Sequence, residues 1–272
     1  MMRNVIIHAH IFKNAGTTFD HSLRKNFADG FIDHRQDQEL VQGKQEYLNQ
    51  YLALHPECQA LSSHSVHFNI ESSESLNLFP VYFIRHPIER IRSVYEFEKK
   101  QNADTPGARK AKEMDLEGFV DWYLEESSPA TIRNVHTIFL SGQGPSADRL
   151  EEKFEQAMTV LEKPAVCINV VDRYDQSMLV MEDKLSADFP GIDLSYVRKN
   201  VTDKNPESSL ENKLNTFLAG VSQSCQEKII QKNQWDLALY EAANKRLDKE
   251  VQKINDLYAR HQDFMVRCKA HH

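Results

Sequence analysis

Short apolar runs alternate with polar, amphipathic stretches along most of the chain. The apolar runs are rich in β-branched and aromatic residues and predict buried strands at residues 4–11, 58–63, 79–84 and 165–171. The stretches between them are typical of helices, which are expected at residues 17–27, 38–54, 88–100, 116–125, 149–161 and 174–185. Strands that alternate with helices indicate an α/β fold, with an open, mostly parallel sheet covered by helices on both faces.

Loops are predicted at residues 12–16, 102–109 and 141–146, and the chain from residue 208 onward is almost entirely helical. We expect a single domain over residues 1–272, with a helical C-terminal region at about 208–265. The last helix carries an apolar stripe that packs on its own domain: Tyr240, Leu247, Val251, Ile254 and Tyr258. The alternative for this stripe is a coiled-coil partner, and so a homodimer.

Composition narrows the class of protein. The 272 residues include 33 basic and 40 acidic side chains, a formal charge of −7 that argues against general nucleic-acid binding but leaves room for a small phosphate site. The four cysteines are scattered without metal-ligand spacing, which is typical of a reduced, intracellular chain. The apolar start at Val5–Ile7 is too short for a signal peptide or a membrane span, so the expected location is the cytoplasm.

The first candidate site follows the first strand, where Lys13, Asn14, Ala15, Gly16, Thr17 and Thr18 lead into a helix. Amides at a helix N-terminus bind anions, Gly16 permits close backbone approach, and Lys13 adds a positive charge. The lysine precedes the glycine by three residues, so this is not the magnesium-holding loop of nucleoside triphosphatases. A plain strand-to-helix turn with a threonine cap is an equally good interpretation of this segment alone.

The second candidate site is at the end of the strand at residues 79–84. Arg85 ends the strand and Ser93 lies two turns into the next helix, at the edge where open α/β sheets bind ligands. Arginine binds phosphate bidentately, so Arg85 is a candidate phosphate ligand. Arg90 and Arg92 are expected on a solvated helix face, with Glu89 as a local partner.

The two segments together resemble the sulfotransferases that use 3′-phosphoadenosine 5′-phosphosulfate (PAPS), in particular the carbohydrate branch with the heparan sulfate 2-O-sulfotransferases. His10–Thr18 is similar to the family motif H-I-P-K-T-A-G-T-T, with Phe12 for Pro and Asn14 for Thr. Arg85–Tyr95 is similar to R-D-P-I-E-R-L-x-S-x-Y, with His86 for Asp. Weaker similarity continues downstream, at residues 134–142, 171–175, 200–202 and 235–240.

This resemblance implies a P-loop-like sheet and a sulfuryl transfer from PAPS to a hydroxyl acceptor, with a carbohydrate expected and 3′-phosphoadenosine 5′-phosphate (PAP) as product. The loop residues Lys13 to Thr18 would bind the 5′-phosphosulfate, and Arg85 and Ser93 the 3′-phosphate. No metal is expected. A histidine between the two motifs would be the base, and His64 aligns best, with Ser63 for the family's glycine and His67 as a competitor.

The chemistry agrees with a histidine base and a catalytic Lys13. An imidazole titrates near neutrality and suits removal of a hydroxyl proton, and fixed donors such as Lys13 stabilise the charge on a leaving phosphate. The transfer is expected in line, without a covalent enzyme intermediate. His64 and His67 lack a third metal ligand at a recognisable spacing, so a metal site is not expected there. His8 is expected to pack in the first strand, and no role is assigned to His10.

Two alternatives stay open at this stage. A small-molecule kinase of similar architecture predicts magnesium dependence and a lysine after the loop glycine, which this chain lacks. A non-catalytic nucleotide-binding or scaffold protein is favoured by the departures from the motifs at Phe12, Asn14 and His86.

Overall fold

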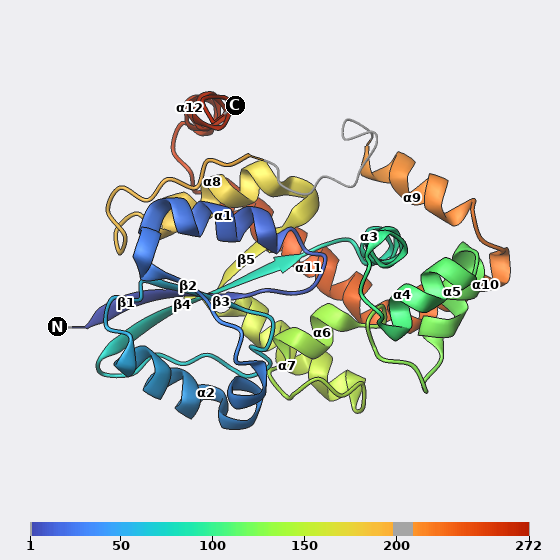
Figure 1. Ribbon diagram of the computed structural model, residues 1–272. Coiled ribbons are helices and arrows are strands. Elements are labelled where there is room, and N and C mark those ends of the chain that lie inside the picture. The colour runs from blue at the N-terminus through green and yellow to red at the C-terminus, as the bar shows by residue number, and fades with distance from the viewer. Residues whose placement is uncertain (1, 198–208, 272) are drawn as a thin grey trace.

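Five parallel strands form the centre of the molecule in the computed structural model, which describes residues 2–197 and 209–271 (Figure 1). The strands are β1 (Arg3–Ala9), β2 (Phe31–Asp33), β3 (Ala60–Ser63), β4 (Leu76–Ile84) and β5 (Cys167–Val170). They are ordered β2-β3-β1-β4-β5, and each neighbouring pair is parallel. Two short 3₁₀ turns, Ala28–Gly30 and Val171–Arg173, precede β2 and follow β5. The predicted α/β fold with a parallel sheet is confirmed.

Helices cover both faces of this sheet because each strand is apolar on both sides. Along β1, Ile6 points into one cluster and its neighbours Val5 and Ile7 point into the other, as the two-residue period of a strand requires. The Ile6 face is covered by α1 (Gly16–Phe27), α8 (Tyr174–Leu185) and α12 (Leu257–Lys269). The opposite face is covered by α2 (Asp37–Leu54), α6 (Val135–Leu140), α7 (Leu150–Glu162) and α11 (Gln234–Val251).

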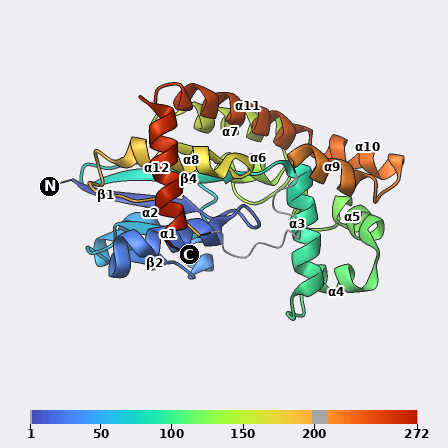
Figure 2. The same cartoon turned by 90° about the horizontal axis from the view of Figure 1, so that it is seen from above.

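A third group of helices lies beyond the carboxyl ends of the strands (Figure 2). It has its own apolar cluster, which includes Ile91, Phe119 and Ile229. Its members are α3 (Pro87–Lys100), α4 (Pro106–Glu113), α5 (Leu116–Leu124), α9 (Leu210–Leu218) and α10 (Gln223–Lys232). The helical C-terminal region is thus confirmed, but its helices belong to different layers.

Some sequence-based expectations about elements were wrong. The loop predicted at residues 102–109 contains the start of α4, because the Thr105 side chain accepts a hydrogen bond from the Ala108 amide and Pro106 fits the first turn. The apolar stripe does not lie on one helix, since α11 ends at Val251 and α12 begins at Leu257 after Asp256 in a left-handed conformation. Tyr258 is accordingly 77% exposed.

Two further properties of the described residues concern membrane spans and disulfide bonds. None of the helices in residues 2–197 and 209–271 is long and apolar enough to cross a membrane. The four cysteines (Cys58, Cys167, Cys225 and Cys268) are all buried and unpaired.

Candidate functional site

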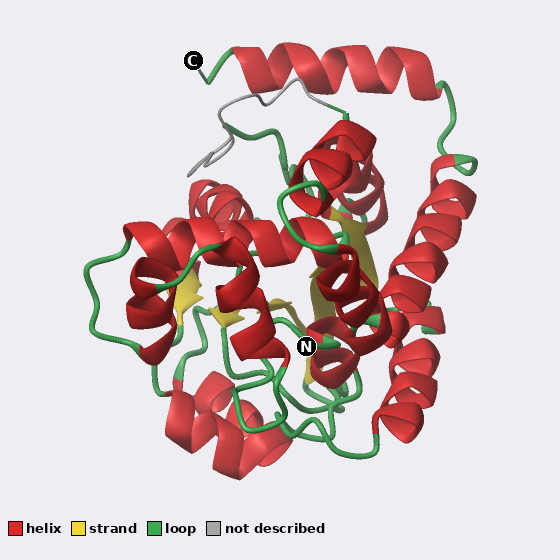
Figure 3. Ribbon diagram, turned by 90° about the vertical axis from the view of Figure 1, so that its right-hand side faces the viewer, coloured by secondary structure: helices red, strands yellow, loops and turns green. Residues whose placement is uncertain are grey.

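A cleft of about 1360 Å³ opens at the carboxyl edge of the sheet, the side that faces the viewer in Figure 3. It lies where β1, β3, β4 and β5 end, which is the usual place for ligands in open α/β folds. Its lining contains every site residue expected from the sequence: Lys13, Asn14, Ala15, Gly16, Thr17, Thr18, His64, Arg85 and Ser93. The fold therefore brings together groups that are up to 80 positions apart in the chain.

The loop between β1 and α1 has a strained backbone. Lys13 and Ala15 both adopt the left-handed conformation, with φ angles of 64° and 60°, which non-glycine residues rarely adopt and which is common at functional sites. The conformation opens the first turn of α1, and the amides of Gly16 and Thr17 make no hydrogen bond to other described residues. Amides in this position are ready donors for an anion.

The Lys13 side chain lies against an aromatic ring instead of reaching into solvent. Its Nζ is 4.5 Å from the centroid of the Phe97 ring on α3. Burial and, to a smaller extent, the charge of the neighbouring Arg85 lower the pKa of Lys13 to about 8. A bound anion would favour the charged form, so Lys13 suits a phosphate ligand.

Asn14 has its side chain turned into the core, unlike a phosphate ligand. Its Nδ2 donates to the carbonyl oxygen of Phe83 and lies 2.8 Å from Nε2 of His136. The side chain thus fixes the loop to β4 and α6, and its contribution to the cleft is through the backbone.

His136 and Asp236 extend this anchor into the C-terminal region. His136 Nδ1 is 2.8 Å from Asp236 Oδ2, and the same carboxylate accepts the amides of His136 and Thr137 at the start of α6. Both side chains are buried; burial alone would raise the pKa of Asp236, but the contact with His136 outweighs it and the pKa is lowered. This pairing joins two segments, residues 134–142 and residues 235–240. The sequence analysis singled out both segments but assigned a role to neither.

Arg85 connects the two sequence motifs directly. Its guanidinium donates to the Lys13 carbonyl oxygen over 3.1 Å and to Glu89 Oε2 over 3.0 Å. Its buried Nε has no hydrogen-bond partner among the described residues. Such an orphaned donor at the edge of the cleft fits a phosphate oxygen, and Ser93 lines the same cleft two turns further along α3.

The expectation that Arg90 is solvated was wrong. Arg90 is 3% exposed, and its guanidinium donates to the carbonyl oxygens of Phe12 and Thr131 over 3.0 and 2.6 Å. Arg90 therefore connects the start of the loop between β1 and α1 to the chain before α6. Arg92 does pair with Glu89, as expected, and also with Glu96, but its side chain is only 17% exposed and it lines the cleft.

The two candidate bases lie in different surroundings. His64 lines the cleft, and its Nδ1 is 2.7 Å from the carbonyl oxygen of His10, so Nδ1 carries the hydrogen and Nε2 the lone pair. His67 is not part of the cleft lining, and its ring packs 4.0 Å from that of Phe139. Burial lowers the pKa of both, that of His67 to about 4.

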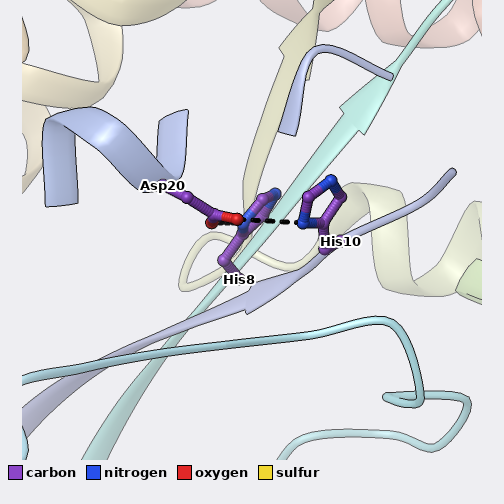
Figure 4. A group of neighbouring side chains, drawn as sticks. All are labelled: His8, His10 and Asp20. Carbon is purple, nitrogen blue, oxygen red and sulfur yellow. Dashed lines mark hydrogen bonds and ion pairs between the residues drawn. The ribbon is translucent and has the colours of Figure 1, made fainter. Parts of the chain in front are cut away.

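A carboxylate that the sequence analysis missed holds two histidines of β1 and the loop after it (Figure 4). Asp20 on α1 contacts Nδ1 of His8 at 2.7 Å and Nδ1 of His10 at 3.0 Å. Gly16 is needed for this arrangement, because a Cβ there would lie 2.1 Å from the His10 ring. Among the described residues these three side chains also bring potential metal-ligating atoms within 4.8 Å of one another. Each oxygen of the Asp20 carboxylate contacts one imidazole Nδ1.

Comparison with known proteins agrees with the motifs. Residues 2–241 match the model of a family described as "Sulfotransferase family". An uncharacterized protein of Archaeoglobus fulgidus is 28% identical over 246 residues, which cover 89% of this chain and 96% of that protein. The family match spans both strand-end motifs and the downstream segments, of which residues 200–202 lie outside the described part of the chain.

Proposed function

Because the chain belongs to the Sulfotransferase family, we propose that it transfers a sulfuryl group from PAPS to an acceptor hydroxyl, with His64 as the base. Family membership gives sulfuryl transfer in general and does not favour the kinase or scaffold alternatives. The donor, the base and the acceptor class are our proposals.

One observation carries the proposal. Lys13 and Arg85, which the sequence placed in two separate motifs, line one cleft, and the guanidinium of Arg85 bonds the backbone of Lys13. The cleft thus combines first-turn amides, a desolvated ammonium group and an arginine whose Nε has no hydrogen-bond partner among residues 2–197 and 209–271. This set of donors suits a ligand with two separate phosphate groups.

Different residues of the cleft would bind the 5′-phosphate and the 3′-phosphate of the nucleotide. Lys13, the amides of Gly16 and Thr17, and the hydroxyl groups of Thr17 and Thr18 would bind the 5′-phosphate, and Arg85 and Ser93 the 3′-phosphate. PAPS supplies the sulfuryl group, bonded to the 5′-phosphate. Lys13 and the amides then stabilise the charge that this phosphate gains as the sulfur–oxygen bond breaks.

His64 would accept the proton of the acceptor. Its Nε2 takes the hydroxyl proton as the acceptor oxygen forms its bond to sulfur, and the backbone carbonyl of His10 holds the opposite nitrogen. The reaction needs no covalent enzyme intermediate and, as we propose, no metal. Asn14 supports the loop instead of contacting the donor with its side chain.

A carbohydrate is the acceptor that we propose, following the resemblance to the heparan sulfate 2-O-sulfotransferases. The test is incubation of the purified protein with PAPS and a panel of oligosaccharides, with mass spectrometry of the acceptor and of PAP. A sulfated sugar and an equal amount of PAP are expected. PAP release without any sulfated product from sugars or other hydroxyl compounds would contradict transfer.

Arg85→Ala should weaken binding of PAP by roughly 10- to 150-fold, because a charge-assisted contact to phosphate contributes about 1.5–3 kcal/mol. The variant should fold, since Glu89 keeps its contact with Arg92 at 3.0 Å. Calorimetric titration measures the loss, and adenosine 5′-phosphate, which lacks the 3′-phosphate, should lose much less affinity. Exposed Arg149, which pairs with Glu152, gives the matched control Arg149→Ala. Equal losses for both nucleotides would contradict the assignment.

A further inference from the structure

Three imidazole rings form a column that leads from the sheet to the cleft. The His8 and His10 rings are stacked with centroids 4.9 Å apart, and the His10 and His64 rings are 4.1 Å apart. His8 and His10 point the same way because they are two positions apart at the end of β1. His64 is thus fixed twice by His10: by the ring face and by the carbonyl oxygen that accepts from Nδ1.

Asp20 contacts two of the three rings in this column, those of His8 and His10. Its two carboxylate oxygens contact Nδ1 of His8 and Nδ1 of His10, so the Asp20 charge holds both rings in one orientation (Figure 4). Burial alone would raise the pKa of Asp20, but the hydrogen bonds from His10 and His8 outweigh it and hold the pKa well below its usual range. The carboxylate is therefore ionised, and each Nδ1 donates to it.

The helix sequence is suited to this contact. Gly16 and Asp20 are four residues apart, so they share one face of α1, directly beside His10. Gly16 leaves the space that the imidazole occupies, and Asp20 supplies its hydrogen-bond acceptor. A side chain at Gly16 would displace His10 and, with it, the carbonyl oxygen that holds His64.

We propose that Asp20 is a positioning residue, which acts through His10 to hold His64 in the orientation of a base and to offset the positive charge that His64 gains. The proposal deepens the proposed function and rests on it for the role of His64. Among the described residues, the charged and titratable side chains that face His64 are His10, Arg35 and Asp20. The Asp20 carboxylate and the His10 carbonyl oxygen favour the protonated His64 ring, whereas the His10 ring and Arg35 oppose it.

The primary test reads the histidine rings directly, by nitrogen-15 NMR of the whole protein with labelled histidine. Assignment uses His10→Gln and His64→Gln variants. In the native protein, the His10 and His64 rings should each carry their hydrogen on Nδ1. In Asp20→Asn, His10 should lose this fixed tautomer and the pKa of His64 should fall, because the carboxylate that favours its imidazolium is gone. Unchanged His64 signals in Asp20→Asn would overturn the proposal.

Kinetics provide the second readout. Asp20→Asn should lower kcat by roughly 10- to 100-fold, the range known for hydrogen-bond partners that orient metal-ligating histidines, while the affinity for PAP stays near that of the native protein. Asp20→Glu should recover part of the loss. The matched control is Asp183→Asn, which removes a helix aspartate paired with Arg260 at the surface. Loss of PAP binding in Asp20→Asn, or zinc retained stoichiometrically at this cluster after purification, would overturn the positioning role.

Failure of the proposed function would look different. In that case the native protein itself would not bind PAP or transfer a sulfuryl group, while the histidine spectra would still report whether Asp20 orients His10 and His64.

Discussion

Replacing His64 with glutamine should lower kcat by about 10²- to 10⁴-fold, the usual contribution of a general base. Affinity for PAP should stay nearly unchanged, because the proposed phosphate ligands are in the loop after β1, at Arg85 after β4 and at Ser93 on α3, and do not include His64. Glutamine keeps the polarity and approximate size of the imidazole but cannot accept the proton. Steady-state rates with the acceptor found in the oligosaccharide panel, together with calorimetric titration of PAP, separate the two quantities.

His67→Gln is the control, since His67 lies in the same segment but outside the cleft lining and packs on Phe139. It should keep most of the activity. The pH profile adds a check: burial lowers the pKa of His64, so the acid limb of kcat/KM should lie below the usual range of histidine. A greater loss in His67→Gln than in His64→Gln would reverse the assignment of the base.

Asp236→Ala should lower the free energy of unfolding by roughly 3–5 kcal/mol, because each buried hydrogen-bond donor that is left without a partner costs about 1–3 kcal/mol. The Asp236 carboxylate is 2% exposed and accepts from the His136 ring and from two backbone amides at the start of α6. Its loss leaves those donors buried without a partner. Urea unfolding followed by circular dichroism measures the change as a lower midpoint with an unchanged slope.

The same helix offers a control for this prediction. Asp248 is also on α11 but pairs with Arg173 at the surface and is 56% exposed, so Asp248→Ala should cost less than about 1 kcal/mol. Similar midpoints for the two variants would contradict the structural role of Asp236. The His136–Asn14 contact connects Asp236 to the loop between β1 and α1, which is proposed to bind the 5′-phosphate. PAP affinity should therefore also fall in Asp236→Ala, and not in Asp248→Ala.

Local patterns were enough to predict most of the sheet and the residues that line the cleft at its carboxyl edge. Strands β1, β4 and β5 are continuous apolar runs, and the loop and Arg85 follow strand ends, where ligands bind in this class of fold. The three-residue β2 carries too short a pattern to be recognised. At α4, the Pro-Gly pair favoured a loop, although the Thr105 cap and Pro106 together signal a helix start.

Contacts between distant residues were the part that the sequence could not supply. Nothing local indicates that Asp236 meets His136, which is 100 positions earlier, or that the Asn14 side chain turns away from the cleft. Arg90 has the spacing of a surface arginine and is buried only because two carbonyl oxygens meet its guanidinium. Asp20 shares the face of Gly16 on α1, but its partners become evident only when α1 packs on β1.

Calorimetric titration with PAP, with and without magnesium, tests whether the cleft binds both phosphates of the nucleotide. Binding should be tight, independent of magnesium and clearly stronger than binding of adenosine 5′-phosphate. Absence of PAP binding, or a preference for ATP with magnesium, would contradict the proposed site.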